Sequence, residues 1–445
     1  MKTAKIGLVG LCSPIESGGE RHDELIASAT TVLGQAGMEV VTAFRSVWNA
    51  GDALHVCDQM READIDAIVI MDVTWVMDSL KYIFIHELKV PVVFWAVPYP
   101  ETFSIGCVQN FASVLKTQGI KFEYVYGLAD DESLISKIKK VAIAGTAIRR
   151  LKTMRVALAG PRQTWRVAGP QDMSLEEWDF SEKLGPTIIH LEMEDIMGEA
   201  EKISEADAAR TLEELKSRTG QIKCSEEVML QSAKMYMATK SLAEEYNLDG
   251  IAAECYPRYG GLMNQVASWL ADEGFVVDTE GDIAHTVLQF ILNLLTDNAP
   301  CVLGETGEVN NEQNYLVVCH EGSSPSSMAA SMDKVVVNPS GETGSFVGVP
   351  VKQMDKVTFA DFQGAEGKYQ LFAATGSTLP VSREEWADAG EKMVMKLRSD
   401  SMSPACVVDK MISEGFHHHI VVKEGDLAEQ LKVICKFADI KFVSI

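Results

Sequence analysis

Two acidic side chains follow directly on a short apolar run near residue 280. Residues 275–278 are β-like, Thr279-Glu280-Gly281-Asp282 comes next, and a helical pattern begins at Ile283. Carboxylates at the carboxyl end of a parallel strand lie where α/β proteins build their sites. Asp282 alone could be a helix cap, because aspartate is a favoured capping residue. A cap explains one acid and not two, so Glu280 is a candidate for chemistry.

A second acidic loop and a histidine follow further along the chain. Glu305 lies in the stretch 302–308, and His320 ends a second predicted strand within 316–322. Carboxylate oxygen and imidazole nitrogen are both ligands for divalent metals. Glu305 is therefore a candidate oxygen ligand and His320 a possible nitrogen ligand. Taken singly, each is more often a solvated acid or an ordinary loop histidine.

Three consecutive histidines, His417-His418-His419, lie in the last part of the sequence. They do not resemble a tag, because an ordered apolar pattern continues through residues 421–445. In a strand, His417 and His419 would face one side and His418 the other. One such ring beside two acids would complete a carboxylate–imidazole site, which suits Mn²⁺, Co²⁺ or Mg²⁺ better than structural zinc. The pattern leaves open which ring binds.

The elements that must position these residues begin with an alternating α/β pattern. Predicted strands lie at 6–11, 40–44, 67–71, 90–95 and 122–126, and predicted helices at 23–35, 54–62 and 133–150. Strands separated by helices favour a parallel sheet that is covered on both faces. We therefore predict a Rossmann-like α/β domain over residues 1–152.

The same pattern restarts at Met154 and changes character near Pro300. Strands are predicted at 154–160, 187–191, 250–255 and 275–278, around a long helical stretch at 199–246. Later β-like runs lie at 335–339, 345–349, 355–359 and 369–374, with one helix near 383–395. Gly, Pro, Ser and Thr separate these runs, as in β-rich domains. The predicted fold class is thus α/β, with two Rossmann-like parallel-sheet domains (1–152 and 153–298) and a β-rich, barrel-like third domain (299–445).

Composition limits the partners and the compartment. The 445 residues carry a formal net charge of −24, which repels phosphate backbones and anionic membranes, so neither nucleic acid nor membrane is an expected partner. Nine cysteines without a CxxC pair argue against a disulfide framework and favour a reducing compartment. The sequence begins without a signal-peptide pattern and contains no apolar run of about 18 residues. We therefore expect a cytoplasmic protein.

Three blocks together resemble the metal-binding blocks of the L-fucose isomerase and L-arabinose isomerase superfamily. The block around Glu280 is similar to the segment that supplies the first metal carboxylate, and Glu305 falls where the second is expected, 305 − 280 = 25 residues later. His418 is similar to the C-terminal metal histidine, and His320 matches a further ligand of the arabinose branch. The resemblance covers essentially the whole chain in order and layout. The sequence departs from the family pattern at Glu305, where the family often has Asp. The histidine triplet also leaves a one-residue choice in which ring binds the metal.

The resemblance implies an aldose–ketose isomerase, an intramolecular oxidoreductase that works through a cis-enediol(ate) on a divalent ion. Mn²⁺ is expected, with Co²⁺ and Mg²⁺ as alternatives. Glu280 and Glu305 would be metal ligands and the acid/base pair, and His418 would be a ligand. His320 would be a fourth ligand or an outer-sphere donor, and Asp282 would orient a ligand from behind. The resemblance also implies a homo-oligomer, a hexamer or a trimer.

The substrate expected from the resemblance is a small sugar. The loop at 160–166 resembles the one that opens the second domain in these proteins, so Arg162, Trp165 and Arg166 are possible substrate contacts, with His419 as a fourth. Fucose, arabinose, another deoxy or pentose sugar and a sulfonated hexose all remain open.

Three other functions compete with that prediction. An isomerase of an unusual, for example sulfonated, aldose would use the same residues. A non-catalytic cytoplasmic sugar-binding protein would not account for Glu280, Glu305 and His418. A nucleotide-dependent oxidoreductase is disfavoured, because residues 7–12 lack the GxGxxG spacing.

Overall fold

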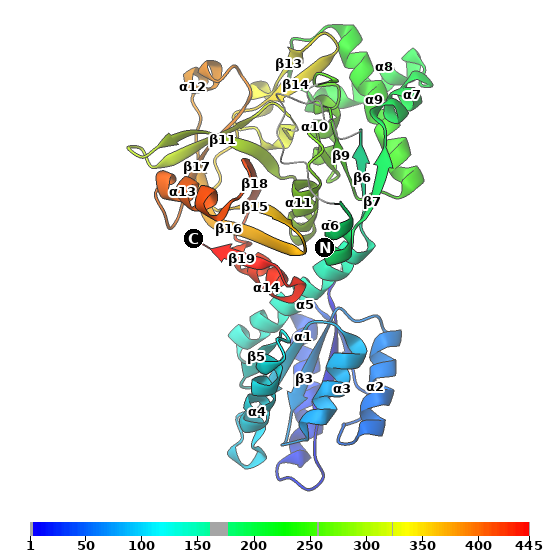
Figure 1. Ribbon diagram of the computed structural model, residues 1–445, viewed down its shortest axis with the longest axis vertical. Helices are drawn as coiled ribbons and strands as arrows, with labels where there is room; N and C mark the ends of the chain where they lie inside the picture. Colours follow the sequence, from blue (N-terminus) through cyan, green and yellow to red (C-terminus); the bar gives the residue numbers. More distant parts are fainter. Residues whose placement is uncertain (1–2, 161–176, 256–257, 323, 445) are drawn as a thin grey trace. The chain divides into compact units, whose positions relative to one another are not determined.

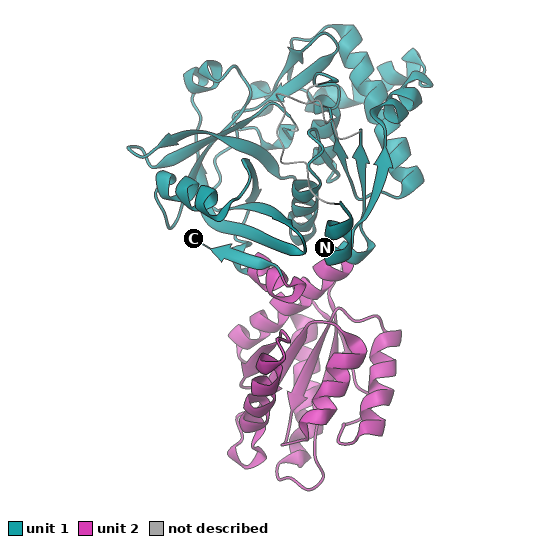
Figure 2. Cartoon of the chain, in the orientation of Figure 1, with its two compact units in different colours: residues 1, 151–429, 440–445 teal, residues 2–150, 430–439 magenta. Residues whose placement is uncertain are grey.

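The computed structural model describes residues 3–160, 177–255, 258–322 and 324–444. The chain divides into two compact units, which Figure 2 shows in different colours. The N-terminal unit holds residues 2–150 and 430–439, and the larger unit holds 151–429 and 440–445. The predicted domain boundary at 298/299 falls inside the larger unit and stays a prediction. No helix in the described ranges is long and apolar enough to cross a membrane.

The N-terminal unit is built on a parallel sheet with helices around it (Figure 1), and the strand order is β2-β1-β3-β4-β5. Its strands are β1 (Lys5–Leu11), β2 (Glu39–Thr42), β3 (Ala67–Asp72), β4 (Val92–Ala96) and β5 (Glu123–Tyr126). Its helices are α1 (His22–Gln35), α2 (Ala50–Glu62), α3 (Asp78–Leu88), α4 (Ser104–Thr117), α5 (Glu132–Thr153) and most of α14 (Ala428–Ala438). The apolar side chains of α1 and α5 cover one face, and those of α2 and α4 cover the other. The predicted parallel α/β sheet is confirmed.

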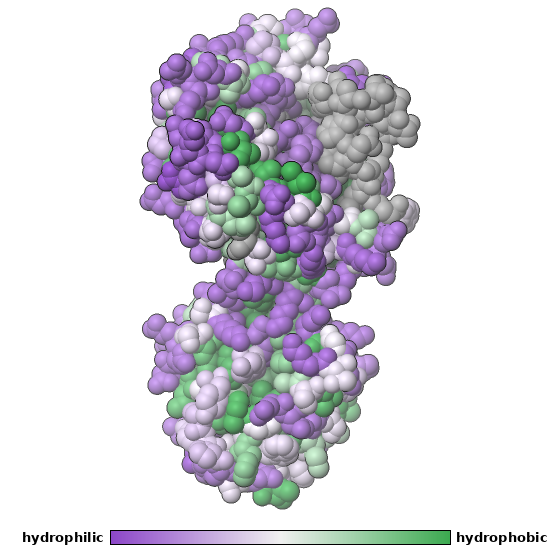
Figure 3. Space-filling model, turned by 60° about the vertical axis from the view of Figure 1, so that its left-hand side comes forward, coloured by the Kyte–Doolittle hydropathy of each residue, from purple (hydrophilic) through white to green (hydrophobic). Residues whose placement is uncertain are grey.

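Large apolar side chains are exposed in the loops that follow the strands of this sheet. The surface of the unit carries hydrophobic patches among polar ones (Figure 3). Ile15 is 89% exposed after β1, Met77 is 72% exposed after β3, and Phe103 is 63% exposed after β4. The homo-oligomer that the sequence resemblance implies stays a prediction.

The larger unit begins with a second parallel sheet, in the strand order β10-β9-β6-β7. Its strands are β6 (Arg155–Ala159), β7 (Thr187–Leu191), β9 (Gly250–Ala253) and β10 (Val276–Asp278). Its helices are α6 (Glu177–Leu184), α7 (Met193–Glu201), α8 (Glu205–Leu215), α9 (Glu226–Tyr246), α10 (Asn264–Asp272) and α11 (Ile283–Leu295). The prediction of one long helical stretch at 199–246 was wrong. Ser204 and Ser225 each start a new helix there, because their side chains accept a backbone N–H of the first turn.

The β-rich region is a mixed sheet that closes on itself. Its strands run β15-β18-β11-β12-β17-β16 in antiparallel pairs, and β15 also pairs with β16, which completes a ring. The bounds are β11 (Val302–Asn310), β12 (Tyr315–His320), β15 (Val357–Ala365), β16 (Lys368–Leu379), β17 (Met393–Ser399) and β18 (His419–Glu424). Strand β19 (Lys441–Ser444) joins β16 in parallel. A small separate sheet contains β8 (Gln221–Ile222), β13 (Val336–Ser340) and β14 (Gly344–Gly348). The predicted β-rich third region is confirmed.

The helix predicted near 383–395 is shorter than expected. Helix α12 (Arg383–Asp388) ends early, and β17 begins at Met393. Met393, Met395 and Leu397 alternate into the core of the ring, a period of two that belongs to a strand. A further helix, α13 (Pro404–Glu414), was not predicted in this region.

Helix α5 packs very closely against the start of β3. The Asp66 carboxylate accepts hydrogen bonds from Thr146 Oγ1 at 3.0 Å and from Arg149 Nε at 2.5 Å, and both donors lie on α5. A Cβ on Gly145 would lie 2.0 Å from the Asp66 carbonyl oxygen. Glycine is therefore required at this position of the helix, because any other side chain would force the two elements apart.

Gly145→Ala is expected to destabilise the protein by about 1–3 kcal/mol, because the added methyl overpacks a buried contact. Gly34→Ala in α1 is the matched control, since nothing lies within 4 Å of its added Cβ. A free-space Gly→Ala in a helix should stabilise by about 0.4–1 kcal/mol. Denaturant unfolding measures both changes. An equal gain in both variants would contradict the close approach of α5 to Asp66.

Candidate metal centre

Glu280 and Asp282 lie in the short loop between β10 and α11. Asp278, at the end of β10, accepts the backbone N–H groups of Glu280 at 2.9 Å and of Asp282 at 2.8 Å through its Oδ1. Gly281 has a φ of +77°, and a Cβ there would lie 2.6 Å from Glu254 Cγ. The Thr-Glu-Gly-Asp run thus needs glycine between its two acids, and it lies at the carboxyl end of a parallel strand, as the sequence predicts.

Asp282 caps α11 and also contacts two imidazole rings. Its Oδ1 accepts the backbone N–H of His285 at 2.9 Å. Its Oδ2 lies 2.6 Å from Nδ1 of His285 and 2.9 Å from Nδ1 of His419. A carboxylate at Nδ1 keeps the proton on that nitrogen and leaves the Nε2 lone pair of His419 available on the other side of the ring. Asp282 is therefore placed both to cap the helix and to orient His419.

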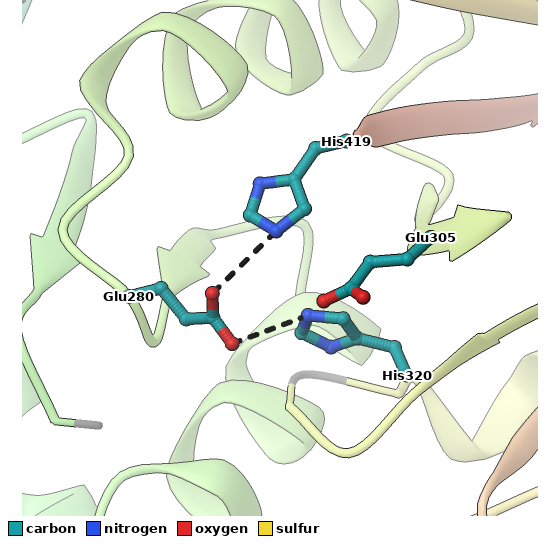
Figure 4. Close-up of side chains that lie close together, drawn as sticks. All are labelled: Glu280, Glu305, His320 and His419. Carbon is teal, nitrogen blue, oxygen red and sulfur yellow. Dashed lines mark ion pairs between the residues drawn. The ribbon is translucent and has the colours of Figure 1, made fainter. Parts of the chain in front are cut away.

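Glu280, Glu305, His320 and His419 converge on one small space (Figure 4). One potential ligand atom from each residue lies within 4.8 Å of all the others. Glu280 comes from the loop before α11, whereas the other three lie on neighbouring strands of the ring. Glu305 on β11 pairs with His419 on β18 in the sheet register. The structure thus brings together the two predicted glutamates and His320 with a histidine of the triplet.

The spacing in this group suits a shared cation. Nε2 of His419 lies 3.5 Å from Glu280 Oε2, and Nε2 of His320 lies 3.5 Å from Glu280 Oε1. A direct N–H···O bond would be about 2.9–3.0 Å long. Two ligand atoms that are each about 2.1 Å from one ion lie roughly 3.0–3.4 Å apart at angles of 90–110°. For His419 and Glu280, this spacing fits an ion between the two atoms better than a direct hydrogen bond.

Negative charge is concentrated around the group. The side chains of Glu254, Asp278, Asp282 and Asp361 are each at most 1% exposed. Burial raises the pKa of Asp278 to about 7, and the charge of Asp282 adds to that shift. Buried carboxylates are costly unless cations lie among them. A divalent ion held by oxygen and nitrogen ligands fits this donor set, and Mn²⁺, Co²⁺ and Mg²⁺ all accept such ligands.

The histidines keep the two glutamates ionised. Burial alone would raise the pKa of Glu280. In the metal-free protein, where Nε2 of His419 can carry a proton and donate to Glu280, His320 and His419 outweigh burial and hold that pKa below its ordinary range. His418 lowers the pKa of Glu305 against a smaller effect of burial. Both carboxylates are therefore available as anionic ligands or as bases near neutral pH.

His418 lies outside the converging group. Its Nε2 is 3.5 Å from Glu305 Oε1, and its side chain is 40% exposed, whereas that of His419 is fully buried. The His417 and His419 rings both lie near His285, with centroids 6.1 and 5.5 Å away, although β18 begins only at His419. The structure thus brings His419, and not the expected His418, to Glu280. The ligand role predicted for His418 and the substrate contact predicted for His419 both stay predictions.

His320 is held from its other side by the backbone. The N–H of Gly322 donates to Nδ1 of His320 at 2.8 Å. A neutral imidazole that accepts at Nδ1 carries its proton on Nε2, the nitrogen that faces Glu280. Two roles were predicted for His320, a fourth metal ligand or an outer-sphere donor. This contact favours the donor.

Sequence reasoning missed two residues that complete the surroundings of the site. His285 lies one helical turn after Asp282, and Asp361 lies in the apolar strand β15. A charged residue inside an apolar strand is rarely buried without a partner, and this was the available signal for Asp361. The predicted substrate contacts Arg162, Trp165 and Arg166 lie outside the described residues.

Comparison with known proteins gives distant but extensive similarity to proteins named sulfoquinovose isomerase. The relative from Alkalicoccus urumqiensis is 21% identical over 392 residues, which cover 85% of this chain and 86% of the relative. The relative from Priestia aryabhattai is 20% identical over 386 residues, which cover 84% of each chain. The one from Clostridium sp. (strain MSTE9) is 21% identical over 385 residues, 82% and 83% of the two chains. No family model matches the chain.

Likeness to solved structures is weak. A transcription regulator like protein from Staphylococcus haemolyticus has a TM-score of 0.18 at 12% identity, over 57% of this chain and 79% of that one. A sugar ABC transport substrate-binding protein from Bordetella parapertussis 12822 has a TM-score of 0.17 at 14% identity, over 69% and 85%. Scores this low carry no argument about fold or function.

Mn²⁺ is expected to raise the melting temperature, because a ligand that binds only the folded state at 100 times its Kd stabilises it by about 2.7 kcal/mol. Glu280→Gln and His419→Gln should lose this increase. His418→Gln, on the adjacent position of the chain, is the matched control and should keep most of it. Thermal unfolding with and without Mn²⁺ measures the increase for each variant. Loss in His418→Gln with retention in His419→Gln would reverse the choice of ring.

Proposed function

We propose that this protein is a metal-dependent aldose–ketose isomerase that acts on a sulfonated aldose of the sulfoquinovose class. The observation that carries the proposal is the convergence of Glu280, Glu305, His320 and His419 within 4.8 Å. The distant relatives named sulfoquinovose isomerase, which match most of the chain, support both the reaction and the substrate class.

The reaction moves a proton between C1 and C2 of an open-chain sugar, whose C–H groups are weak acids. A bound divalent ion supplies Lewis acidity that stabilises the negative charge on the two sugar oxygens. Glu280, Glu305 and His419 would hold that ion. Asp282, hydrogen-bonded to Nδ1 of His419, would keep the His419 ring turned so that Nε2 faces it.

The two glutamates differ in their surroundings, and we assign them different tasks. The Glu280 side chain is 15% exposed and lies between His320 and His419, so it serves mainly as a ligand. The Glu305 side chain is 42% exposed and can reach a bound sugar. An ionised carboxylate at that position can take the proton from carbon and return it to the neighbouring carbon.

Two histidines would then assist the substrate oxygens and the base. His320 presents its Nε2–H toward the space between the acids, where it can donate to a sugar oxygen or to Glu280. His418, beside Glu305, would orient that carboxylate. The proposal therefore uses one histidine as ligand, one as donor and one as support for the base.

Purified protein with Mn²⁺ is expected to convert sulfoquinovose to its ketose. Its kcat/KM should be at least about 100-fold above that for glucose, which carries a hydroxyl in place of the sulfonate. An enzyme typically discriminates by this much or more against an analogue that lacks a polar group that its site binds. Fucose and arabinose complete the panel, and ketose formation is the readout. EDTA should abolish turnover. Absence of ketose from every aldose in the panel would sink the isomerase proposal, and equal rates for glucose would remove its sulfonated-substrate part.

Glu305→Gln is expected to lower kcat by about 10²–10⁴-fold, the usual contribution of a general base. Mn²⁺ binding should weaken less than in Glu280→Gln, because the Glu305 side chain is 42% exposed and serves mainly as the base, whereas that of Glu280 is 15% exposed and serves mainly as a ligand. Turnover in D₂O should place deuterium on the transferred carbon of the product, since the proton passes through a carboxylate. NMR of the product measures the deuterium. Product without deuterium, together with a normal kcat in Glu305→Gln, would contradict the assigned base.

A further inference from the structure

His285 lies fully buried between two carboxylates. Its Nδ1 is 2.6 Å from Asp282 Oδ2, and its Nε2 is 3.0 Å from Asp361 Oδ1. The side chains of His285 and Asp361 are 0% exposed, and Asp282 is 1% exposed. Both ring nitrogens are thus at hydrogen-bond distance from acids that water does not reach.

Both nitrogens of His285 face a carboxyl group in this arrangement. Each nitrogen can share a hydrogen bond with the acid beside it, whether the proton lies on the ring or on the carboxyl oxygen. The geometry therefore makes His285 a buried bridge from Asp282 to Asp361.

The bridge connects elements that surround the candidate metal centre. His285 lies in the first turn of α11, Asp361 lies on β15, and His419 lies on β18, which pairs with β15. The same oxygen of Asp282, Oδ2, contacts Nδ1 of His285 and Nδ1 of His419. Movement of the Asp282 carboxylate would therefore turn the His419 ring.

We infer that His285, anchored by Asp361, is a positioning residue that fixes Asp282 and, through it, the direction of Nε2 of His419. The inference deepens the proposed function and rests on it for the role of His419 as a ligand. His285 touches neither the reacting atoms nor the ion; it acts through Asp282. Removal of a hydrogen-bonding residue behind a metal ligand typically changes metal affinity by about 10–100-fold.

A second cation at His285, Asp361 and His417 is the competing arrangement. One potential ligand atom from each of these residues lies within 4.8 Å of the other two. An ion there would need the lone pair of His285 Nε2, but that nitrogen lies 3.0 Å from an Asp361 oxygen, an ordinary hydrogen-bond length. The two arrangements predict different numbers of bound ions per chain, one for the bridge and two for a second site.

The test measures Mn²⁺ affinity and stoichiometry in the full chain, by the EPR signal of free Mn²⁺, without any substrate. His285→Leu removes both ring nitrogens and should weaken Mn²⁺ binding by about 10–100-fold. His285→Asn keeps an N–H near the Nδ1 position and should recover most of that loss. Gln289→Leu, one turn further along α11, is the matched control and should bind Mn²⁺ as the wild type does.

Asp361→Asn gives a second approach from β15, in case His285→Leu fails to fold. It keeps the shape of the side chain and removes the charge, so it should weaken Mn²⁺ binding in the same direction and leave a stoichiometry of one. The protein's circular dichroism and melting temperature without metal establish that each variant is folded.

Two results would overturn the inference. One is wild-type Mn²⁺ affinity in folded His285→Leu or folded Asp361→Asn. The other is a wild-type stoichiometry of two that falls to one in Asp361→Asn, which would make these residues ligands. Neither readout needs turnover. A protein that binds one Mn²⁺ and responds to these variants, yet isomerises no aldose, would retain the positioning role and lose the proposed function.

Discussion

The hydrogen bonding of one buried carboxylate, that of Asp282, is the constraint on which the candidate centre depends. It accepts the backbone N–H of His285 in the first turn of α11 and contacts Nδ1 of two histidines, and the backbone N–H of Asp282 donates to Asp278. An ionised group out of water is several kcal/mol unfavourable unless it is paired and hydrogen-bonded in this way. The same contacts join the end of the second parallel sheet to the closed ring of strands, so the chemistry of the site and the packing of the larger unit have a common origin.

Much of the fold could be predicted where burial gives a simple pattern. Strand β3 lies close to its predicted bounds, because a parallel strand covered on both faces is a continuous apolar run. Helix α3 was missed because Lys81 interrupts its apolar face, and only the structure shows that Lys81 is buried and bonded to the Cys107 carbonyl. Helix α13 carried a sequence signal that was not used: Ser403 caps it, and Pro404 occupies its first turn.

The sequence indicates the two glutamates of the candidate site, but it does not indicate which of the three histidines faces them. Glu280 and Glu305 follow from strand ends and from the family spacing, whereas the choice among three histidines depends on how β18 pairs with β11. A shift of one residue in a strand moves every side chain to the opposite face, and no property of three identical residues indicates that shift. In the structure, Glu305 pairs with His419, which places the His419 ring on the side of Glu280. His285 and Asp361 needed the tertiary fold, since 361 − 285 = 76 residues separate two groups that bond directly.

The path of the last sixteen residues, 430–445, affects how the protein can be assembled during translation. Residues 430–439 belong to the N-terminal unit, where Val433 and Phe437 pack against the core and Gln430 donates to Lys140, and 440–445 return to pair β19 with β16. Domains emerging from a ribosome generally fold in order from the amino end. Folding in that order leaves an apolar surface of the N-terminal unit uncovered and part of the β16 edge unpaired until residues 430–444 join them, and an unpaired edge is a template for association between chains. Completion of both units therefore depends on a segment that lies far in sequence from the elements that it covers.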